Sequence, residues 1–154
     1  MNTIWSKYVQ GTKTLYYSRK LRFDDLFSDQ YRDLFELDAK QELRILEIGC
    51  GPGALAGALH RWYPLAEITA VDRDSEFVRF GTENEPGVNF VEGDATALPF
   101  ENNTFDVTIS NTVAEHIEPS KFYGEQLRVL KPGWNMPCTF LAKRNQYQSE
   151  LHYF

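Results

Sequence analysis

The sequence of 154 residues has little cysteine, no long apolar run and no apolar segment near its N-terminus. No run approaches the roughly 20 apolar residues that a membrane-spanning helix needs, so we expect no membrane span. The two cysteines, Cys50 and Cys138, are too few for a disulfide framework and lack metal-ligand spacing. We therefore expect structural thiols, no bound metal and a reducing, cytoplasmic compartment.

Blocks of basic residues are also absent. The chain has 16 Lys and Arg against 22 Asp and Glu, a formal net charge of −6. Since nucleic-acid binding depends mostly on neutralising phosphates, this balance disfavours a nucleic-acid partner. A local basic patch at Lys13, Arg19, Lys20 and Arg22 stays possible, but we expect these side chains to form a solvated face.

Strand and helix patterns alternate from residue 44 onward. Residues 4–41 are aromatic and polar and predict two or three short helices. Strands are expected at 44–48, 67–71, 88–91 and 105–110, with helices near 54–62, 75–82 and 119–130. This order predicts an α/β fold with a doubly wound, mostly parallel sheet, whose ligands bind at the carboxyl ends of the strands.

A glycine-rich turn follows the first expected strand, where residues 44–54 read R-I-L-E-I-G-C-G-P-G-A. Glycines there let the backbone turn tightly and approach a ligand, and the helix N-terminus that follows favours an anionic group. Asp72, at the end of the second strand, can accept both hydroxyls of a ribose. The pair predicts a pocket for an adenosine-containing cofactor, but it also satisfies the dinucleotide fingerprint, so an NAD-dependent oxidoreductase stays open.

Four motifs in order carry a resemblance to a known family. They are Glu-x-Gly-x-Gly-x-Gly at 47–53, Asp72, Gly-Asp-Ala at 93–95 and Leu-Lys-Pro-Gly at 130–133. Together they resemble class I S-adenosylmethionine-dependent methyltransferases, in the branch acting on small molecules and quinones. The resemblance implies a Rossmann-like S-adenosylmethionine-binding domain over residues 44–154 and an N-terminal helical lid over 1–43.

The resemblance also implies roles for single residues. Gly49, Gly51 and Gly53 would line the methionine part of S-adenosylmethionine, whose ammonium Glu47 would bind. Asp72 would bind the ribose and Asn111 would face the ammonium and the methyl group. The adenine would be contacted by Arg73, Asp94 and Ala95.

Two further groups of residues have alternative roles. Glu115 and His116 are weak candidates for a catalytic acid and base, or for a positioning pair. Four aromatic residues either line a substrate pocket or pack ordinarily: Trp5, Tyr8, Tyr16 and Tyr17.

The implied activity is methyl transfer to a small-molecule or lipid-like acceptor, by in-line attack on the sulfonium methyl group. The alternative is a non-catalytic or partner-dependent S-adenosylmethionine-binding module. The methyl acceptor and the methylated atom are not identified by any motif.

The C-terminal part departs from the family pattern. The family's sheet has seven strands, whereas this sequence has room for about five, with Trp134 and Pro137 where a glycine and an apolar strand are expected. Three explanations stay open: a shortened or frameshifted form, completion by a homodimer through the exposed sheet edge, or a minimal cofactor-binding domain. Under each we expect cofactor binding with impaired or absent turnover for this chain alone.

Overall fold

A parallel five-stranded sheet forms the centre of the computed structural model, which describes residues 11–111, 113, 116–133 and 138–140. Its strand order is β3-β2-β1-β4-β5, and each adjacent pair is parallel. The strands are β1 (Arg44–Ile48), β2 (Glu67–Asp72), β3 (Asn89–Glu92), β4 (Val107–Asn111) and β5 (Cys138–Phe140). The helices are α1 (Thr12–Arg22), η2 (Asp25–Phe27), α2 (Ser28–Phe35), α3 (Ala54–Trp62), α4 (Ser75–Asn84) and α5 (Pro119–Val129).

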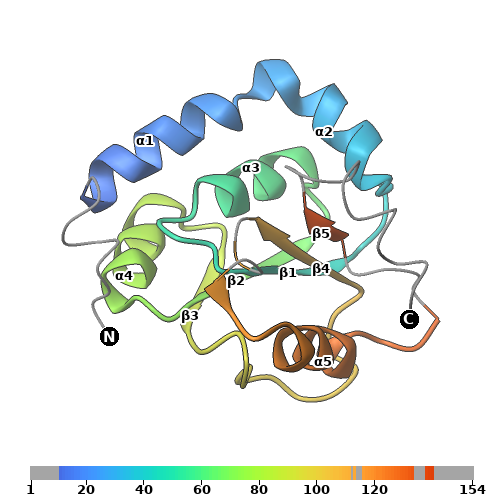
Figure 1. Cartoon of the computed structure of the whole chain (residues 1–154). Coiled ribbons are helices and arrows are strands. Elements are labelled where there is room, and N and C mark those ends of the chain that lie inside the picture. Colours follow the sequence, from blue (N-terminus) through green and yellow to red (C-terminus); the bar gives the residue numbers. More distant parts are fainter. Residues whose placement is uncertain (1–10, 112, 114–115, 134–137, 141–154) are drawn as a thin grey trace.

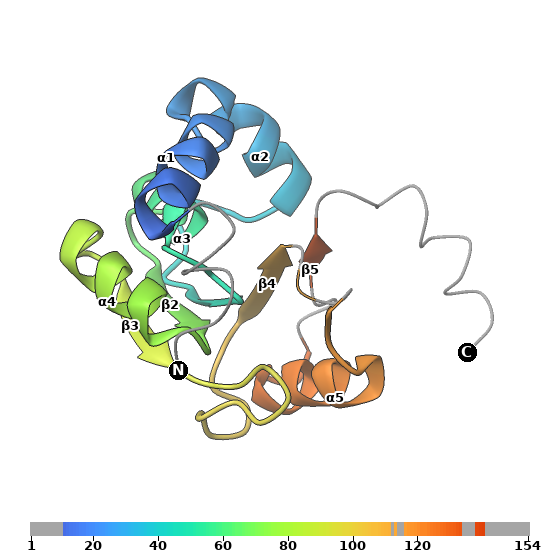
Figure 2. The ribbon, with the colours of Figure 1, turned by 60° about the vertical axis from the view of Figure 1, so that its left-hand side comes forward.

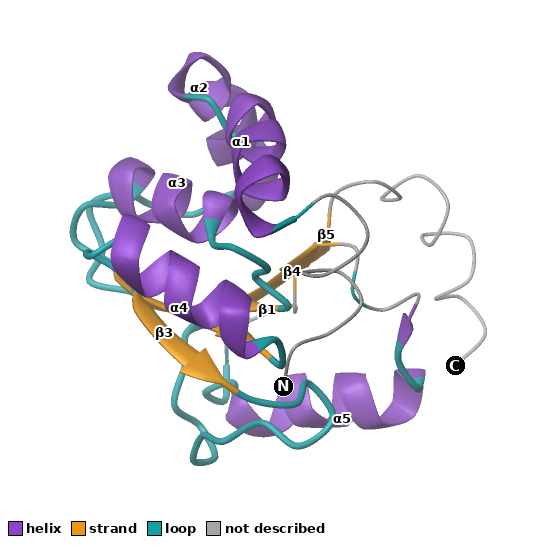
Figure 3. Ribbon diagram, turned by 90° about the vertical axis from the view of Figure 1, so that its left-hand side faces the viewer, coloured by secondary structure: helices purple, strands orange, loops and turns teal. Residues whose placement is uncertain are grey.

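The described helices cover both faces of the sheet. Helices α1 and α2 arch over α3 on one side, whereas α5 lies on the other (Figure 1). The turned views in Figures 2 and 3 keep this division, with α3 and α4 on the same side as α1. The expected doubly wound α/β fold of about five strands is confirmed.

Alternate residues of β1 supply two separate cores. Ile45 packs in the cluster that also contains Tyr16 of α1 and Leu59 of α3. Leu46 and Ile48 belong to the cluster on the opposite face, which includes Phe122 of α5. Successive side chains of a strand point to opposite faces, so a strand covered on both sides is apolar at most of its positions. The same alternation turns Glu47 toward the α3 side.

Local sequence signals set the helix ends. Asp74 precedes α4, and its side chain accepts a hydrogen bond from the Glu76 backbone N–H at 3.0 Å. Glu118 caps α5 in the same way ahead of Pro119 at the first helical position. Helix α3 ends at Trp62, just before Pro64. The loops after β1 (49–53) and β2 (73–74) are therefore short, whereas the segment from β3 to β4 (93–106) contains no helix.

The predicted strand bounds hold for β1 and shift elsewhere. The prediction that the fourth strand begins at Phe105 is wrong, because β4 begins at Val107. Phe105 instead forms an isolated bridge with Leu130, just past α5. Strand β4 also extends through Asn111, which is therefore the last residue of the strand and not the first of the loop.

No helix among the described residues is long and apolar enough to cross a membrane.

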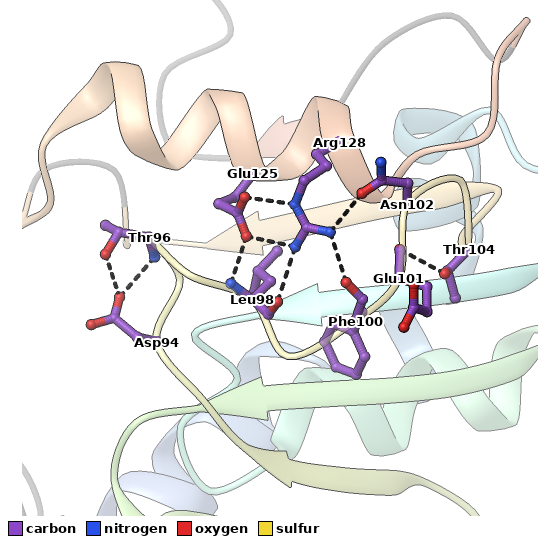
Figure 4. A network of polar contacts seen from close by, with 9 residues as sticks. All are labelled: Asp94, Thr96, Leu98, Phe100, Glu101, Asn102, Thr104, Glu125 and Arg128. Atoms are coloured by element: carbon purple, nitrogen blue, oxygen red, sulfur yellow. Dashed lines mark hydrogen bonds and ion pairs between the residues drawn. The ribbon is translucent and has the colours of Figure 1, made fainter.

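Arg128 of α5 holds the loop between β3 and β4 in place (Figure 4). Its guanidinium donates to the carbonyl oxygens of Leu98, at 2.9 Å, and Phe100, at 2.7 Å. It also pairs with Glu125, whose carboxylate accepts from the Leu98 backbone N–H at 2.6 Å. The hydrogen bond from Arg128 lowers the pKa of Glu125. One side chain thus fixes the loop that begins with Gly93 and Asp94.

We expect Arg128→Met to lower the free energy of unfolding by about 1–2 kcal/mol, because two loop carbonyls and Glu125 lose their donor. Thermal unfolding should show a melting temperature several degrees lower. Lys121→Met, on an exposed position of the same helix, is the control and should change little. Equal melting temperatures for the two variants would contradict the assigned role of Arg128.

Candidate functional site

A cavity of about 370 Å³ lies where the strands of the sheet end. Ile48, Asp72 and Asn111 line it from the last positions of β1, β2 and β4, and Gly93 follows β3. Other described residues that line the cavity come from α1, from the start of α4 and from the segment before α5. The remaining lining residues are Leu15, Arg19, Gly49, Gly51, Val71, Arg73, Phe77, Asp94, Ala95, Thr96, Val113, His116, Ile117 and Glu118.

Most of the predicted cofactor residues meet at this cavity. Those among its lining residues are Gly49, Gly51, Asp72, Arg73, Asp94, Ala95 and Asn111. Glu47 and Gly53 are not among them, although Glu47 directly precedes Ile48, which is. Gly53 instead adjoins the ring of Phe90, 2.5 Å from where a Cβ on Gly53 would lie. Predicted residues separated by up to 62 positions, from Gly49 to Asn111, are thus brought to one place by the topology of the sheet.

The glycine turn is tied to the end of β2 by Asp72. One carboxylate oxygen of Asp72 accepts from the Gly51 backbone N–H at 2.8 Å, and the other accepts from the Asp74 N–H at 2.9 Å. Gly51 has φ 56°, a conformation that favours glycine. Burial raises the pKa of Asp72, while these two backbone donors lower it. Asp72 therefore shapes the turn as well as facing the cavity.

Glu47 is buried beneath the glycine turn, with 2% of its surface exposed. The Ala56 backbone N–H, in the first turn of α3, donates to its carboxylate. Its Oε2 atom has no hydrogen-bond partner among the described residues. Burial raises the pKa of Glu47 to about 8, and the nearby Arg19 guanidinium opposes that rise. A buried carboxyl of this kind is a ready acceptor for a cationic group of a ligand.

Asp94 plays a part in its own loop. Its Oδ1 atom accepts from both the backbone N–H and the hydroxyl of Thr96, each at 2.7 Å (Figure 4). These bonds lower the pKa of Asp94 and keep its carboxylate ionised. The carboxylate is therefore a turn-forming group that also lies on the cavity wall, where its second oxygen can accept a bond.

Of the two candidate catalytic residues, Glu115 and His116, the structure describes only His116. His116 lines the cavity, and its backbone N–H donates to the carbonyl of Val113 at 3.0 Å. Glu115 lies outside the described residues, as do Trp5 and Tyr8 of the aromatic set. Tyr16 packs in the core against Phe80, and Tyr17 is 53% exposed. Neither tyrosine is among the lining residues, so the described half of that set packs ordinarily or faces solvent.

Arg19 is the lining residue that contradicts the expected solvated basic face. Lys13, Lys20 and Arg22 are exposed, as expected, but Arg19 is only partly exposed and reaches the glycine turn. The signal that could have found it is spacing, since the buried Thr12, Tyr16 and Phe23 lie seven, three and four residues from Arg19. Leu15 and Val113 were also missed, because only the tertiary fold brings them to the cavity.

Comparisons with known proteins agree on one family. A methyltransferase-domain family model matches residues 46–134. The chain is 39% identical over 110 residues to a probable phthiotriol/phenolphthiotriol dimycocerosates methyltransferase of Mycobacterium ulcerans, covering 65% of this chain and 42% of that protein. It is also 39% identical over 94 residues to a fatty-acid O-methyltransferase of Mycolicibacterium smegmatis, covering 58% of this chain and 34% of that protein. The chain thus spans about two fifths or less of the length of these relatives.

A solved structure supports the same assignment. A SAM-dependent methyltransferase from Aquifex aeolicus superposes with a TM-score of 0.60 at 26% identity, covering 75% of this chain and 67% of that chain. The family match begins in β1 and ends just past α5, so it includes the glycine turn, Asp72 and the loop of Asp94.

The raised pKa of Glu47 gives a pH-dependent stability of the ligand-free chain. Folding favours the protonated carboxyl, so this contribution is complete below the ordinary pKa of 4.5 and is lost as pH rises through about 8. Between pH 6 and 8 we expect wild-type stability to fall by about 1–2 kcal/mol relative to Glu47→Gln.

Urea unfolding at pH 6, 7 and 8 measures this difference. Glu83→Gln, at an exposed position of α4, should follow the wild type at each pH. Parallel pH profiles for wild type and Glu47→Gln would show that Glu47 is already ionised in the folded chain.

Proposed function

This chain belongs to the methyltransferase-domain family, and we propose that it transfers a methyl group from S-adenosylmethionine to a small or lipid-like acceptor. The observation that carries the proposal is the meeting of Asp72, Asp94 and the glycine turn at one cavity. Each comes from the carboxyl end of a different strand. A cavity in this position is the usual ligand site of a doubly wound sheet.

The adenosine part of S-adenosylmethionine suits the side of the cavity next to β2 and β3. Asp72 would accept the ribose hydroxyls while it keeps its bonds to the turn. Asp94 has one oxygen left beyond its Thr96 bonds, which suits the adenine amino group. The Ala95 N–H would donate to a ring nitrogen, and Arg73 would lie beside the adenine.

The methionine part suits the glycine turn. The buried carboxyl of Glu47, with Oε2 lacking a partner among the described residues, would take the ammonium directly or through water. Asn111, 7% exposed at the end of β4, would direct its carbonyl to the same group. Gly49 and Gly51 would let the backbone approach the ligand. The residues present therefore fit this cofactor.

The reaction requires the protein mainly to position the methyl donor and the acceptor. S-adenosylmethionine supplies a methyl group on a sulfonium, which is already a good leaving group. The chain's residues then need to hold the donor and acceptor in line and to exclude water. His116 lines the cavity and would help to orient an acceptor or take its proton. Glu115 keeps the same proposed role. The N-terminal helices over residues 1–43 would serve as the lid.

An apolar acceptor suits the remaining wall of the cavity. Leu15, Val113 and Ile117 contribute aliphatic side chains there. Two relatives are named for acceptors that include a fatty acid and phthiotriol dimycocerosates. This combination favours a lipid-like acceptor over a polar one.

Compartment and partners are proposed from simpler features. Cys50 is a free thiol, which suits a reducing cytoplasm, and its burial raises its pKa and keeps it protonated. The acidic balance of the chain disfavours a nucleic-acid partner. Pairing of two copies along the outer side of β5 remains a proposal that a solution mass would test.

Calorimetric titration tests the cofactor assignment. We expect micromolar binding of S-adenosylmethionine and S-adenosylhomocysteine and no binding of NAD. Asp72→Ala should weaken both by about 10- to 100-fold, since it removes charge-assisted bonds to the ribose. Asp72→Asn keeps the size of the side chain but loses its charge and one of its two acceptor oxygens, so it should also weaken them, whereas Glu83→Ala should not. Binding of NAD alone, or full affinity in both Asp72 variants, would refute the assignment.

Transfer of a labelled methyl group tests the activity. With methyl-labelled S-adenosylmethionine, we expect label in the organic extract when a long-chain fatty acid or hydroxylated lipid is added, and little with short polar analogues. Formation of S-adenosylhomocysteine should rise in parallel. Tight cofactor binding without transfer to any acceptor would instead favour a binding module that needs a partner.

A further inference from the structure

Four large apolar side chains are exposed in the N-terminal helical layer. They are Tyr17 and Leu21 of α1 and Leu26 and Phe27 of η2, which we call the apolar patch. The described residues expose seven large apolar side chains in all, so more than half of them fall between positions 17 and 27. Leu21 is 74% exposed and Leu26 is 87% exposed, more than any other of the seven. Single exposed apolar residues are ordinary, but a group of them marks a surface that binds a partner.

The apolar patch is separate from the cavity. Helices α1 and α2 form the outermost described layer on their side of the sheet, beyond α3 (Figures 1 and 3). On α1, Tyr16 is buried, whereas Tyr17 and Leu21 lie four residues apart and share another face. Leu15 and Arg19 line the cavity, and no residue of the apolar patch is among the described lining.

Cations accompany the apolar patch on α1. The charged residues of this helix are all basic: Lys13, Arg19, Lys20 and Arg22. Lys13, Lys20 and Arg22 are exposed. Lys13 precedes Tyr17 by four positions and Lys20 follows it by three, so both neighbour it on the helix surface. Lys20 also donates to the Tyr16 hydroxyl at 3.3 Å. The helix is therefore a basic and apolar surface on a chain whose formal net charge is −6.

Acidic residues lie in the next segment and not on α1. They are Asp24, Asp25 and Asp29. The Asp24 carboxylate accepts from the Leu26 backbone N–H at 2.9 Å. Asp25 accepts from the Arg61 guanidinium at 3.1 Å and from the Trp62 indole N–H at 2.9 Å. Two of the three carboxylates are thus held by donors of the chain itself, and the α1 part of the surface stays positive.

We propose that the apolar patch and the exposed cations of α1 bind the surface of an anionic lipid bilayer. A helix that lies in such an interface inserts its apolar side chains at the headgroup boundary and keeps its lysine and arginine charges among the phosphates. Each cation near an anionic surface contributes about 1 kcal/mol. The rest of the chain is acidic, so the same surface repels it, and charge determines which side faces the bilayer.

A second copy of this chain fits the apolar patch less well. In a twofold dimer the same patch meets itself. The exposed cations Lys13, Lys20 and Arg22 would then oppose the same cations of the other copy. Like charges that face each other across an interface disfavour the pairing. The charge pattern therefore selects an anionic partner.

Binding to a bilayer would bring the cavity close to lipids. Tyr17 and Leu21 lie on one side of α1, while Leu15 and Arg19 of the same helix line the cavity. The two surfaces are thus separated by about the 10 Å width of one helix. This surface goes beyond the proposed methyl transfer, because attachment to a bilayer requires neither the cofactor nor an acceptor.

Flotation with vesicles tests the proposal, using phosphatidylcholine alone or mixed with about 40% phosphatidylglycerol. We expect the chain to float with the anionic vesicles, to stay in solution with the neutral ones, and to bind less at high salt. The double variant Leu21→Ser, Leu26→Ser should weaken binding by about 10-fold or more, since it removes inserted apolar area. The double variant Lys13→Gln, Arg22→Gln should weaken it by about 10-fold, since it removes two charges.

Matched controls come from α5, on the other side of the sheet (Figure 1). Leu127→Ser and Lys121→Gln change exposed residues of the same types and should leave vesicle binding unchanged. All six substituted positions are exposed, so each variant should melt at the wild-type temperature. That measurement separates loss of the surface from loss of the fold.

The results that overturn the proposal are distinct. Binding that the α1 and L21S/L26S changes leave intact places the surface elsewhere, and equal binding to neutral and anionic vesicles, or binding to neither, refutes it. A dimer in sedimentation velocity that Leu21→Ser, Leu26→Ser dissociates, without vesicle binding, assigns the apolar patch to a second copy instead. The cofactor assignment is tested separately, because calorimetry with S-adenosylhomocysteine needs no vesicles.

Discussion

The carboxylate of Asp72 is the group on which the site depends. Its two oxygens accept from the backbone of Gly51 and of Asp74, so one side chain joins the turn after β1 to the turn after β2. The φ of 56° at Gly51 suits glycine and brings that N–H within reach. Parallel pairing of β1 with β2 places the two turns side by side. The cavity is therefore a direct result of strand order plus one buried acid.

Several charged side chains lie together in this region and partly offset one another. Glu47 and Asp72 are held in surroundings that raise their pKa values, and Arg19 offsets part of that cost from α1. The N-terminal helices thus contribute to the site's electrostatics, in addition to their apolar packing through Tyr16, Phe23 and Phe35.

The sequence was most informative where a single local pattern determines structure. The apolar run at 44–48, the glycine turn and Asp72 identified β1 and the centre of the site, because parallel strands covered on both sides have few alternatives. It was least informative where two distant segments decide the outcome. Phe105 pairs with Leu130 and so lies outside β4, and Val113 packs over Gly49, neither of which follows from local propensity. Arg19 was misassigned because four basic residues in one helix suggest a solvated face until the burial of Tyr16 and Phe23 shows which side is covered.

A structure of the chain with S-adenosylhomocysteine bound tests the central claim most directly, which is that this cavity is a cofactor site assembled by Asp72. We expect the ribose hydroxyls to bind Asp72, the adenine to lie beside Asp94 and Ala95, and the amino acid group to lie along Gly51. We also expect the hydrogen bonds from the Gly51 and Asp74 backbone N–H groups to Asp72 to persist in the complex. A ligand bound elsewhere, or a glycine turn detached from Asp72 in the complex, would contradict it.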